Sequence, residues 1–242
     1  MCTVFIDFDR GRAWPVLLAG VRDEFRDRPW SPPAAHWPEL GGHVLGGRDE
    51  VAGGTWLAVD TDAPAVAVVL NQPPSPHDAT ATVSRGTLPL AALRSLDVDP
   101  EGYAGFHLLR CTLDAVVLLS WDGVTLDRRE LAEGRHIVSS LGADNPAHPR
   151  VGHTMPGFRA LPATAPEPGL PTAGAWGGWL GMVGGDGLPG DDDRALLVDR
   201  VFEGRHYASG SVSLVGLAAD GRVRYDFTAS PREPHWRPVP LA

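Results

Sequence analysis

The sequence contains no lysine, so all 21 of its basic residues are arginine. This absence excludes any mechanism that needs a lysine Schiff base, and it excludes a phosphate-binding loop with a Walker lysine. Alanine, glycine and proline are abundant, a composition typical of GC-rich codon usage. We therefore expect a bacterial source and assign the missing lysine no function of its own.

Cysteine and long apolar runs are also scarce. The chain has two cysteines, Cys2 and Cys111, which are too few for a disulfide framework. No apolar run reaches the roughly 18 residues that a membrane-spanning helix needs. Asp7 and Asp9 interrupt the only apolar run near the N-terminus, which argues against a signal peptide. We expect a cytoplasmic protein with one domain spanning residues 1–242.

Charge and histidine spacing exclude several classes of partner and cofactor. A net charge of −9 without a basic stripe disfavours nucleic acid and anionic membranes as partners, so we expect no nucleic acid and no membrane insertion. The nine histidines form no metal signature, because His148 and His153 lack further ligands at a suitable spacing. Asp7 and Asp9 resemble the Asp-x-Asp nucleophile of haloacid-dehalogenase-like phosphatases, which need magnesium, a basic partner and a parallel sheet. The sequence lacks those features, so we expect no metal and no cofactor.

The first thirty residues contain the most informative pattern. Two short apolar runs, 2–8 and 16–21, flank a turn-rich break and predict a β-hairpin. The second run ends in a charged cluster that begins with Arg22 and Asp23. Because a hairpin returns the end of its second strand to the start of the first, both side chains should lie near Cys2.

Cys2 follows the initiator methionine directly, which gives it two chemical groups of interest. Methionine aminopeptidase removes Met1 when the next residue is small, and this leaves Cys2 with a thiol and a free α-amine. The amine titrates near ~7.7–8.0 and can act as a base. The thiol, with a pKa near ~8.5, becomes a nucleophile when deprotonated. Arg22 would favour the thiolate and Asp23 would orient the ammonium. The alternative is that Cys2 is only a small hydrophobe at a frayed terminus.

Further short motifs follow in order over roughly the first 150 residues. They are Arg22-Asp23-Glu24-Phe25, Arg28-Pro29, Trp37, Gly46-Gly47-Arg48-Asp49, Ala52-Gly53-Gly54-Thr55-Trp56-Leu57, Asn71, Ser84-Arg85-Gly86, Tyr103, Gly105-Phe106, Asp144-Asn145-Pro146 and Pro149-Arg150-Val151. Together with the opening Met-Cys, this set resembles the NRDE family of transport and Golgi organisation proteins.

The resemblance carries expectations about fold and site. The family is similar to N-terminal-nucleophile (Ntn) hydrolases, which implies an α+β fold, a four-layer αββα sandwich of two stacked antiparallel sheets. The successive hairpin patterns of this sequence favour the same architecture independently. The site implied by the resemblance has a catalytic set, Cys2, Arg22, Asp23 and Asn71, and two substrate-binding residues, Ser140 and Trp56.

The site departs from the family pattern at three places. Val21 replaces the asparagine of the motif, Leu70 replaces a polar residue before Asn71, and Ser139-Ser140 replaces a Ser-Asn pair. Asn71 could still stabilise an oxyanion. The expected function is hydrolysis of an amide bond in a small molecule, with Cys2 as the nucleophile.

Two non-enzymatic functions stay open at this point. Some relatives are associated with haem or lipid handling, so the same cleft could carry haem or another apolar ligand, although no Cys-Pro haem-binding dipeptide occurs. An interaction protein with a degenerate site is the third alternative.

The remaining elements follow from periodicity and turn residues. Strands are expected in hairpins or meanders over 55–59 with 65–70, 103–138, and 211–218 with 222–227. Helices are expected over 84–96, 176–183 and 195–202. Loops and turns are expected over 29–38, 41–54, 146–175 and 184–193, with an irregular tail from Pro231.

Overall fold

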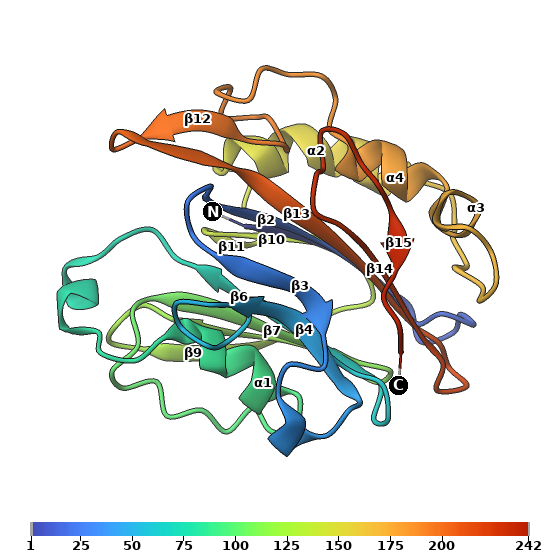
Figure 1. The fold of residues 1–242 in the computed structure, drawn as a ribbon, viewed down its shortest axis with the longest axis horizontal. Helices are drawn as coiled ribbons and strands as arrows, with labels where there is room; N and C mark the ends of the chain where they lie inside the picture. The colour runs from blue at the N-terminus through green and yellow to red at the C-terminus, as the bar shows by residue number, and fades with distance from the viewer. Residues whose placement is uncertain (1, 242) are drawn as a thin grey trace.

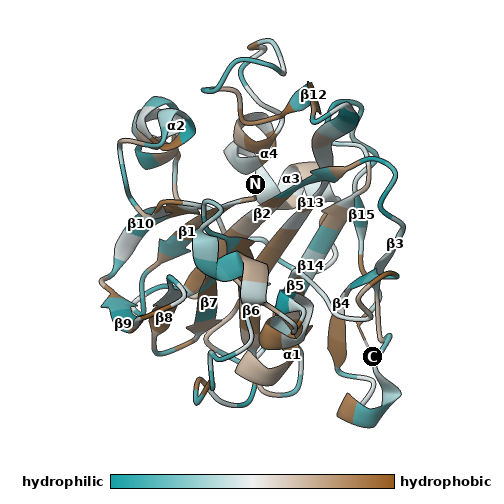
Figure 2. Cartoon of the chain, turned by 90° about the vertical axis from the view of Figure 1, so that its left-hand side faces the viewer, coloured by the Kyte–Doolittle hydropathy of each residue, from teal (hydrophilic) through white to brown (hydrophobic). Residues whose placement is uncertain are grey.

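Two antiparallel sheets stacked face to face form the centre of the computed structural model, which describes residues 2–241 (Figure 1). Sheet A has the strand order β11-β10-β1-β2-β13-β14-β15, with β12 pairing on β13. Sheet B has the order β3-β4-β5-β6-β7-β8-β9. Within the described chain, helices α2, α3 and α4 lie over sheet A and the short α1 lies against sheet B (Figure 2).

The elements have the following bounds. Sheet A contains β1 (Thr3–Phe8), β2 (Val16–Phe25), β10 (Gly134–Ser139), β11 (Gly142–Ala143), β12 (Asp199–Phe202), β13 (Arg205–Leu217), β14 (Val223–Thr228) and β15 (Arg237–Pro238). Sheet B contains β3 (Trp30–Ala34), β4 (Val44–Asp49), β5 (Leu57–Asp60), β6 (Ala65–Asn71), β7 (Phe106–Thr112), β8 (Val116–Trp121) and β9 (Leu126–Leu131). The helices are α1 (Leu88–Ala92), α2 (Pro149–Arg159), α3 (Thr172–Trp176) and α4 (Gly178–Val183), and short 3₁₀ turns occur at η1 (Pro38–Leu40), η2 (Pro76–Thr80) and η3 (Arg85–Thr87).

Alternation along the strands explains this layering. In β1, Val4 and Ile6 belong to the apolar core that also contains residues of sheet B, whereas Phe5 belongs to the core beneath α2 and α4. Successive side chains of a strand point to opposite faces, so one apolar run supplies both cores. The predicted α+β sandwich of two stacked antiparallel sheets is confirmed.

The N-terminal hairpin is confirmed, and its register is now defined. Thr3 pairs with Val21 and Phe8 pairs with Val16. β2 continues to Phe25, and its other edge pairs with β13 over most of its length. The strand that carries Arg22 and Asp23 therefore has a neighbour on each side, and both backbone positions are fixed.

Several expected loops and helices were wrong. The proline-dense segment 29–38 contains β3, because a strand at the edge of a sheet tolerates proline. The glycine-rich segment 41–54 contains β4, and segment 146–175 contains α2 and most of α3. The helix expected over 84–96 is shorter than predicted: only η3 and α1 form there. No helix forms over 195–202, and the second half of that segment is the strand β12. None of the described helices is long and apolar enough to cross a membrane.

Candidate functional site

A cleft of about 480 Å³ lies between the end of β2 in sheet A and the end of β6 in sheet B. Cys2 and the end of β2 line it from the side of sheet A. Asn71, from the end of β6, and Trp56, just before β5, line it from the side of sheet B. The structure thus brings together five of the six residues that the sequence singled out: Cys2, Arg22, Asp23, Asn71 and Trp56.

The sixth residue, Ser140, follows the end of β10, which pairs with β1 with Val138 opposite Val4, so it lies near the start of β1 in sheet A. It is buried in the turn between β10 and β11, and its carbonyl accepts a hydrogen bond from His107 Nε2 at 3.2 Å. Ser140 is not among the described residues that line the cleft. The other two departures from the family pattern, Val21 and Leu70, are buried in apolar cores.

Cys2 is half-buried and lies beside the end of β2. Burial raises the pKa of its thiol, and the nearby carboxylate of Asp23 raises it further. A hydrogen bond from the backbone N–H of Asp23 and the charge of Arg22 lower this pKa without reversing the shift. The thiol is therefore protonated at neutral pH, and a base has to remove its proton before it can attack.

Asp23 is anchored from behind by residues outside the hairpin. Arg150 Nη1 donates to its Oδ2 at 3.0 Å, and Ser209 Oγ donates to its Oδ1 at 2.6 Å. The side chain of Arg150 is itself buried and also donates to Thr3 Oγ1 at 2.6 Å. Two buried charges with these hydrogen bonds fix the carboxylate at the end of β2.

Arg150 and Ser209 differ in whether a sequence pattern marks them. Arg150 falls within one of the ordered motifs, so a search for a partner of Asp23 could have found it. Ser209 lies in β13, where no sequence pattern marks it. Only the pairing of β13 with β2, which places Ser209 opposite Asp23, reveals its role.

Arg22 is 4% exposed and lies across an aromatic ring. Its guanidinium carbon is 4.3 Å from the ring centroid of Trp56, and Nη2 lies 3.8 Å from Glu24 Oε2. Desolvation lowers the pKa of Arg22, although the group stays charged at neutral pH. A cation over an aromatic face is stabilised by about 0.5–2 kcal/mol.

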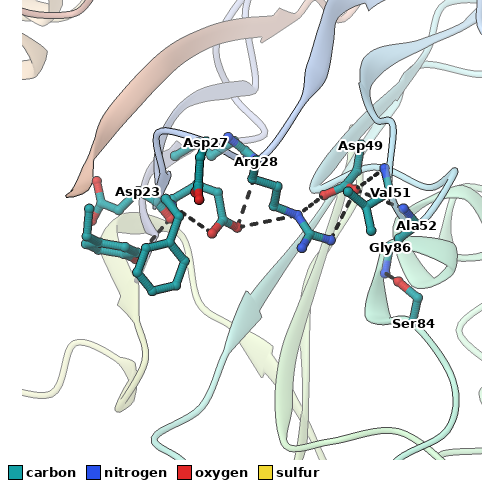
Figure 3. A network of polar contacts seen from close by, with 12 residues as sticks. Asp23, Asp27, Arg28, Asp49, Val51, Ala52, Ser84 and Gly86 are labelled. Atoms are coloured by element: carbon teal, nitrogen blue, oxygen red, sulfur yellow. Dashed lines mark hydrogen bonds and ion pairs between the residues drawn. The ribbon is translucent and has the colours of Figure 1, made fainter. Parts of the chain in front are cut away.

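A second arginine pair stiffens the neighbouring wall (Figure 3). Arg28 forms a bidentate ion pair with Asp49: its Nε donates to Oδ2 at 2.6 Å and its Nη2 to Oδ1 at 3.1 Å. Asp49 Oδ1 also accepts the backbone N–H groups of Val51 and Ala52, each at 3.0 Å. Burial opposes ionisation of Asp49, but these hydrogen bonds prevail and lower its pKa.

Two further polar side chains line the cleft, Asn71 at the end of β6 and Arg85 on η3. Asn71 is exposed, and its side-chain amide forms no hydrogen bond with residues 2–241. Arg85, on η3, donates from Nη1 to the carbonyl of Gly105 at 2.9 Å, and desolvation lowers its pKa. The sequence reasoning assigned Arg85 no role, although it stands in the Ser84-Arg85-Gly86 motif.

The described residues contain no group of three or more histidine, cysteine, aspartate or glutamate side chains able to hold a metal ion.

Comparison with curated protein sequences found no match. A family model described as Transport and Golgi organisation 2 matches residues 1–152, which is more than half of the 242-residue chain. The chain therefore belongs to the Transport and Golgi organisation 2 family.

Proposed function

We propose that this protein, after removal of Met1, hydrolyses a carbon–nitrogen amide bond in a small molecule, with Cys2 as the nucleophile. The observation that carries the proposal is the position of the Cys2 thiol in a cleft of about 480 Å³, with Arg22, Asp23 and Asn71 around it. A cleft of this size accommodates a small molecule rather than a folded protein.

The chemistry proceeds in two steps. The α-amine of Cys2 takes the proton from the thiol as sulfur attacks the amide carbonyl carbon, and a tetrahedral oxyanion forms. The same amine returns the proton to the leaving nitrogen, the C–N bond breaks and a thioester remains on Cys2. Water then attacks the thioester, which releases a carboxylic acid and restores the thiol.

The surrounding groups have distinct roles in this proposal. Because burial holds the thiol in its protonated form, the α-amine is required as a base. The amide of Asn71, free of other partners in the described structure, donates to the oxyanion. The anchored carboxylate of Asp23 orients the ammonium, and Trp56 forms an apolar surface for the substrate.

The alternative, a carrier of haem or another apolar ligand, has less support. Four arginines and three carboxylate residues line the cleft, namely Arg22, Arg28, Arg85, Arg205, Asp23, Glu24 and Asp49. An apolar ligand would leave many of these groups without water or a partner, at a cost in free energy. The charged lining therefore favours a polar ligand.

The test compares wild type with Cys2→Ala and Cys111→Ala over a panel of small amides. Cys111 is buried in the core between the sheets, so it serves as the matched cysteine control. We expect turnover by wild type and Cys111→Ala, and a loss of roughly 10³-fold or more in Cys2→Ala. Intact-mass measurement first establishes that Met1 has been removed. Saturable haem binding unaffected by Cys2→Ala, without turnover of any amide, would support the carrier instead.

A further inference from the structure

Two of the four arginines that line the cleft are already neutralised. Arg28 forms a bidentate ion pair with Asp49 at 2.6 and 3.1 Å. Arg205 forms a bidentate pair with Asp27 at 2.6 and 3.2 Å. The paired N–H donors of both guanidinium groups are therefore already occupied by a carboxylate and cannot bind a ligand in the same way.

Arg22 is different, because its buried guanidinium has unused donors. The side chain is 5% exposed and faces the cleft. Within residues 2–241 it contacts Glu24 at 3.8 Å, which is too long for a hydrogen bond, and no other polar group satisfies its N–H donors. Because Arg22 lines the cleft, a ligand bound there can accept hydrogen bonds from these donors.

Arg85, on η3, supplies a second unmatched charge at the same cleft. It uses Nη1 for the carbonyl of Gly105, a neutral acceptor, and has no carboxylate partner within the described residues. Cys2, Arg22 and Arg85 line the same cleft, so both guanidinium groups lie on the side of the thiol that a ligand would reach.

We propose that Arg22 and Arg85 form a subsite for an oxyanion, a carboxylate or a phosphate ester, beside Cys2. The forked donors of arginine match both groups. Taken with the proposed amide hydrolysis, on which this step rests, the substrate class is an amide that carries a negative group close to the cleaved bond.

Alkylation of Cys2 tests the subsite without requiring amide turnover. Iodoacetate and iodoacetamide react by the same displacement, in which the thiolate attacks the methylene carbon and iodide leaves. They differ in that iodoacetate carries a carboxylate and iodoacetamide a neutral amide. We expect iodoacetate to be favoured at Cys2 by about tenfold relative to the same pair of reagents with glutathione. The net charge of −9 repels anions generally, so such a preference has to be local.

A matched pair of variants distinguishes a specific anion-binding subsite from a general effect of positive charge in the cleft. Arg85→Gln and Arg205→Gln each remove one positive charge from the same cleft, but only Arg85 lacks a carboxylate partner. We expect Arg85→Gln to abolish most of the preference and Arg205→Gln to retain it. The ratio of the two alkylation rates cancels any change in thiolate fraction, because the same thiolate attacks both reagents. Equal losses in both variants, or no preference in wild type, would overturn the proposal.

Competition provides a second measurement on wild type in case Arg85→Gln does not fold. Inorganic phosphate and glutarate should each be tested for saturable protection of Cys2 against iodoacetamide, with chloride at matched ionic strength as the control. Protection by glutarate alone assigns a carboxylate site, and protection by phosphate alone assigns a phosphate site. Absence of protection by either overturns the subsite. An inactive amide panel combined with anion protection would refute the hydrolase while leaving the subsite intact.

Discussion

The ion pair between Arg150 and Asp23 places two charges where water hardly reaches. Their side chains are 2% and 0% exposed, and the closest atoms are 3.0 Å apart. Removing one member of such a pair leaves the other buried without compensation, which costs about 3–5 kcal/mol. We expect this loss in the free energy of unfolding for Arg150→Leu, measured by urea denaturation. Arg194→Leu, which removes an exposed arginine bound to Asp192 at 2.7 Å, should have no measurable effect. Similar losses in the two variants would contradict this view of the pair.

His136 and Asp144 form a pH-sensitive pair near the end of β10. A hydrogen bond to Asp144 raises the pKa of His136 above 6.5. Burial opposes ionisation of Asp144, but the hydrogen bond from His136 lowers its pKa below 3.8. The histidine contribution to stability is complete below its unfolded pKa and is lost as pH rises through its folded pKa. The carboxylate contribution is lost only in acid.

We therefore expect His136→Gln to destabilise the protein more near pH 5.5 than near pH 8.5, a range that spans the ordinary histidine pKa of 6.5. The measurement is urea unfolding of wild type and variant at both values. Asp144→Asn should also destabilise the protein more near pH 5.5 than near pH 8.5, because it removes the negative charge that stabilises protonated His136. A wild-type advantage that stays constant, or increases toward pH 8.5, would disprove the assignment.

Helix α2 shows what sequence patterns could not reveal. Proline and glycine predicted a loop, and Pro156 does lie inside the helix. Pro149 occupies the first turn, where proline is tolerated. Arg135 donates to the carbonyls of Phe158, Arg159 and Leu161, which satisfies groups that the end of a helix leaves unpaired. These partners are distant in sequence, so local propensity could not identify them.

The candidate site was more predictable than the loops, for a physical reason. Cys2, Arg22 and Asp23 are brought together by one short hairpin, whose register follows from local alternation. Ser209 and Arg150 reach the site only through β13 and α2, whose placement depends on tertiary packing. Local patterns therefore predicted the hairpin side of the cleft and missed the residues that anchor it.

The close approach of Gly54 to η3 shapes the cleft at the level of elements. A Cβ on Gly54 would lie 2.3 Å from the carbonyl oxygen of Gly86, which accepts a hydrogen bond from Thr55 N at 2.8 Å. Gly54→Ala should therefore push η3 away and cost about 1–3 kcal/mol. Because Arg85 belongs to η3, the alkylation rate of Cys2 by iodoacetate should change as well.

Gly174→Ala is the matched control for this substitution. Gly174 lies in α3, and a Cβ there would have no neighbour within 4 Å. Alanine at that position should be neutral, or stabilising by up to about 1 kcal/mol, because it favours the helix. Thermal melting of both variants gives the comparison. A neutral Gly54→Ala would show that the contact between the two loops is loose.

At the scale of the whole molecule, the part that matches the family model shares sheet A and its apolar core with the rest of the chain. The match ends at residue 152, but β13 lies beside β2 in the middle of sheet A and pairs with it from Tyr207↔Phe25 to Leu217↔Val16. The buried side chains of Trp176 and Trp179 cover the same sheet from α3 and α4. Without residues 153–242, β2 would have an open edge, and the outer face of sheet A would lose much of its cover.

We therefore expect the fragment 1–152 to lack cooperative unfolding and to bind a hydrophobic dye, in contrast to the full chain. Circular dichroism melts and dye fluorescence of both proteins, at equal concentration, provide the measurement. The physical reason is that a sheet edge and an apolar face exposed together favour aggregation over a unique fold. A fragment without a unique fold would not hold Arg22 and Arg85 in one cleft beside Cys2, so Cys2 in the fragment should show no preference for iodoacetate. A sharp melt with intact thiol selectivity in the fragment would mean that the matched segment folds alone and that residues 153–242 are an addition to it.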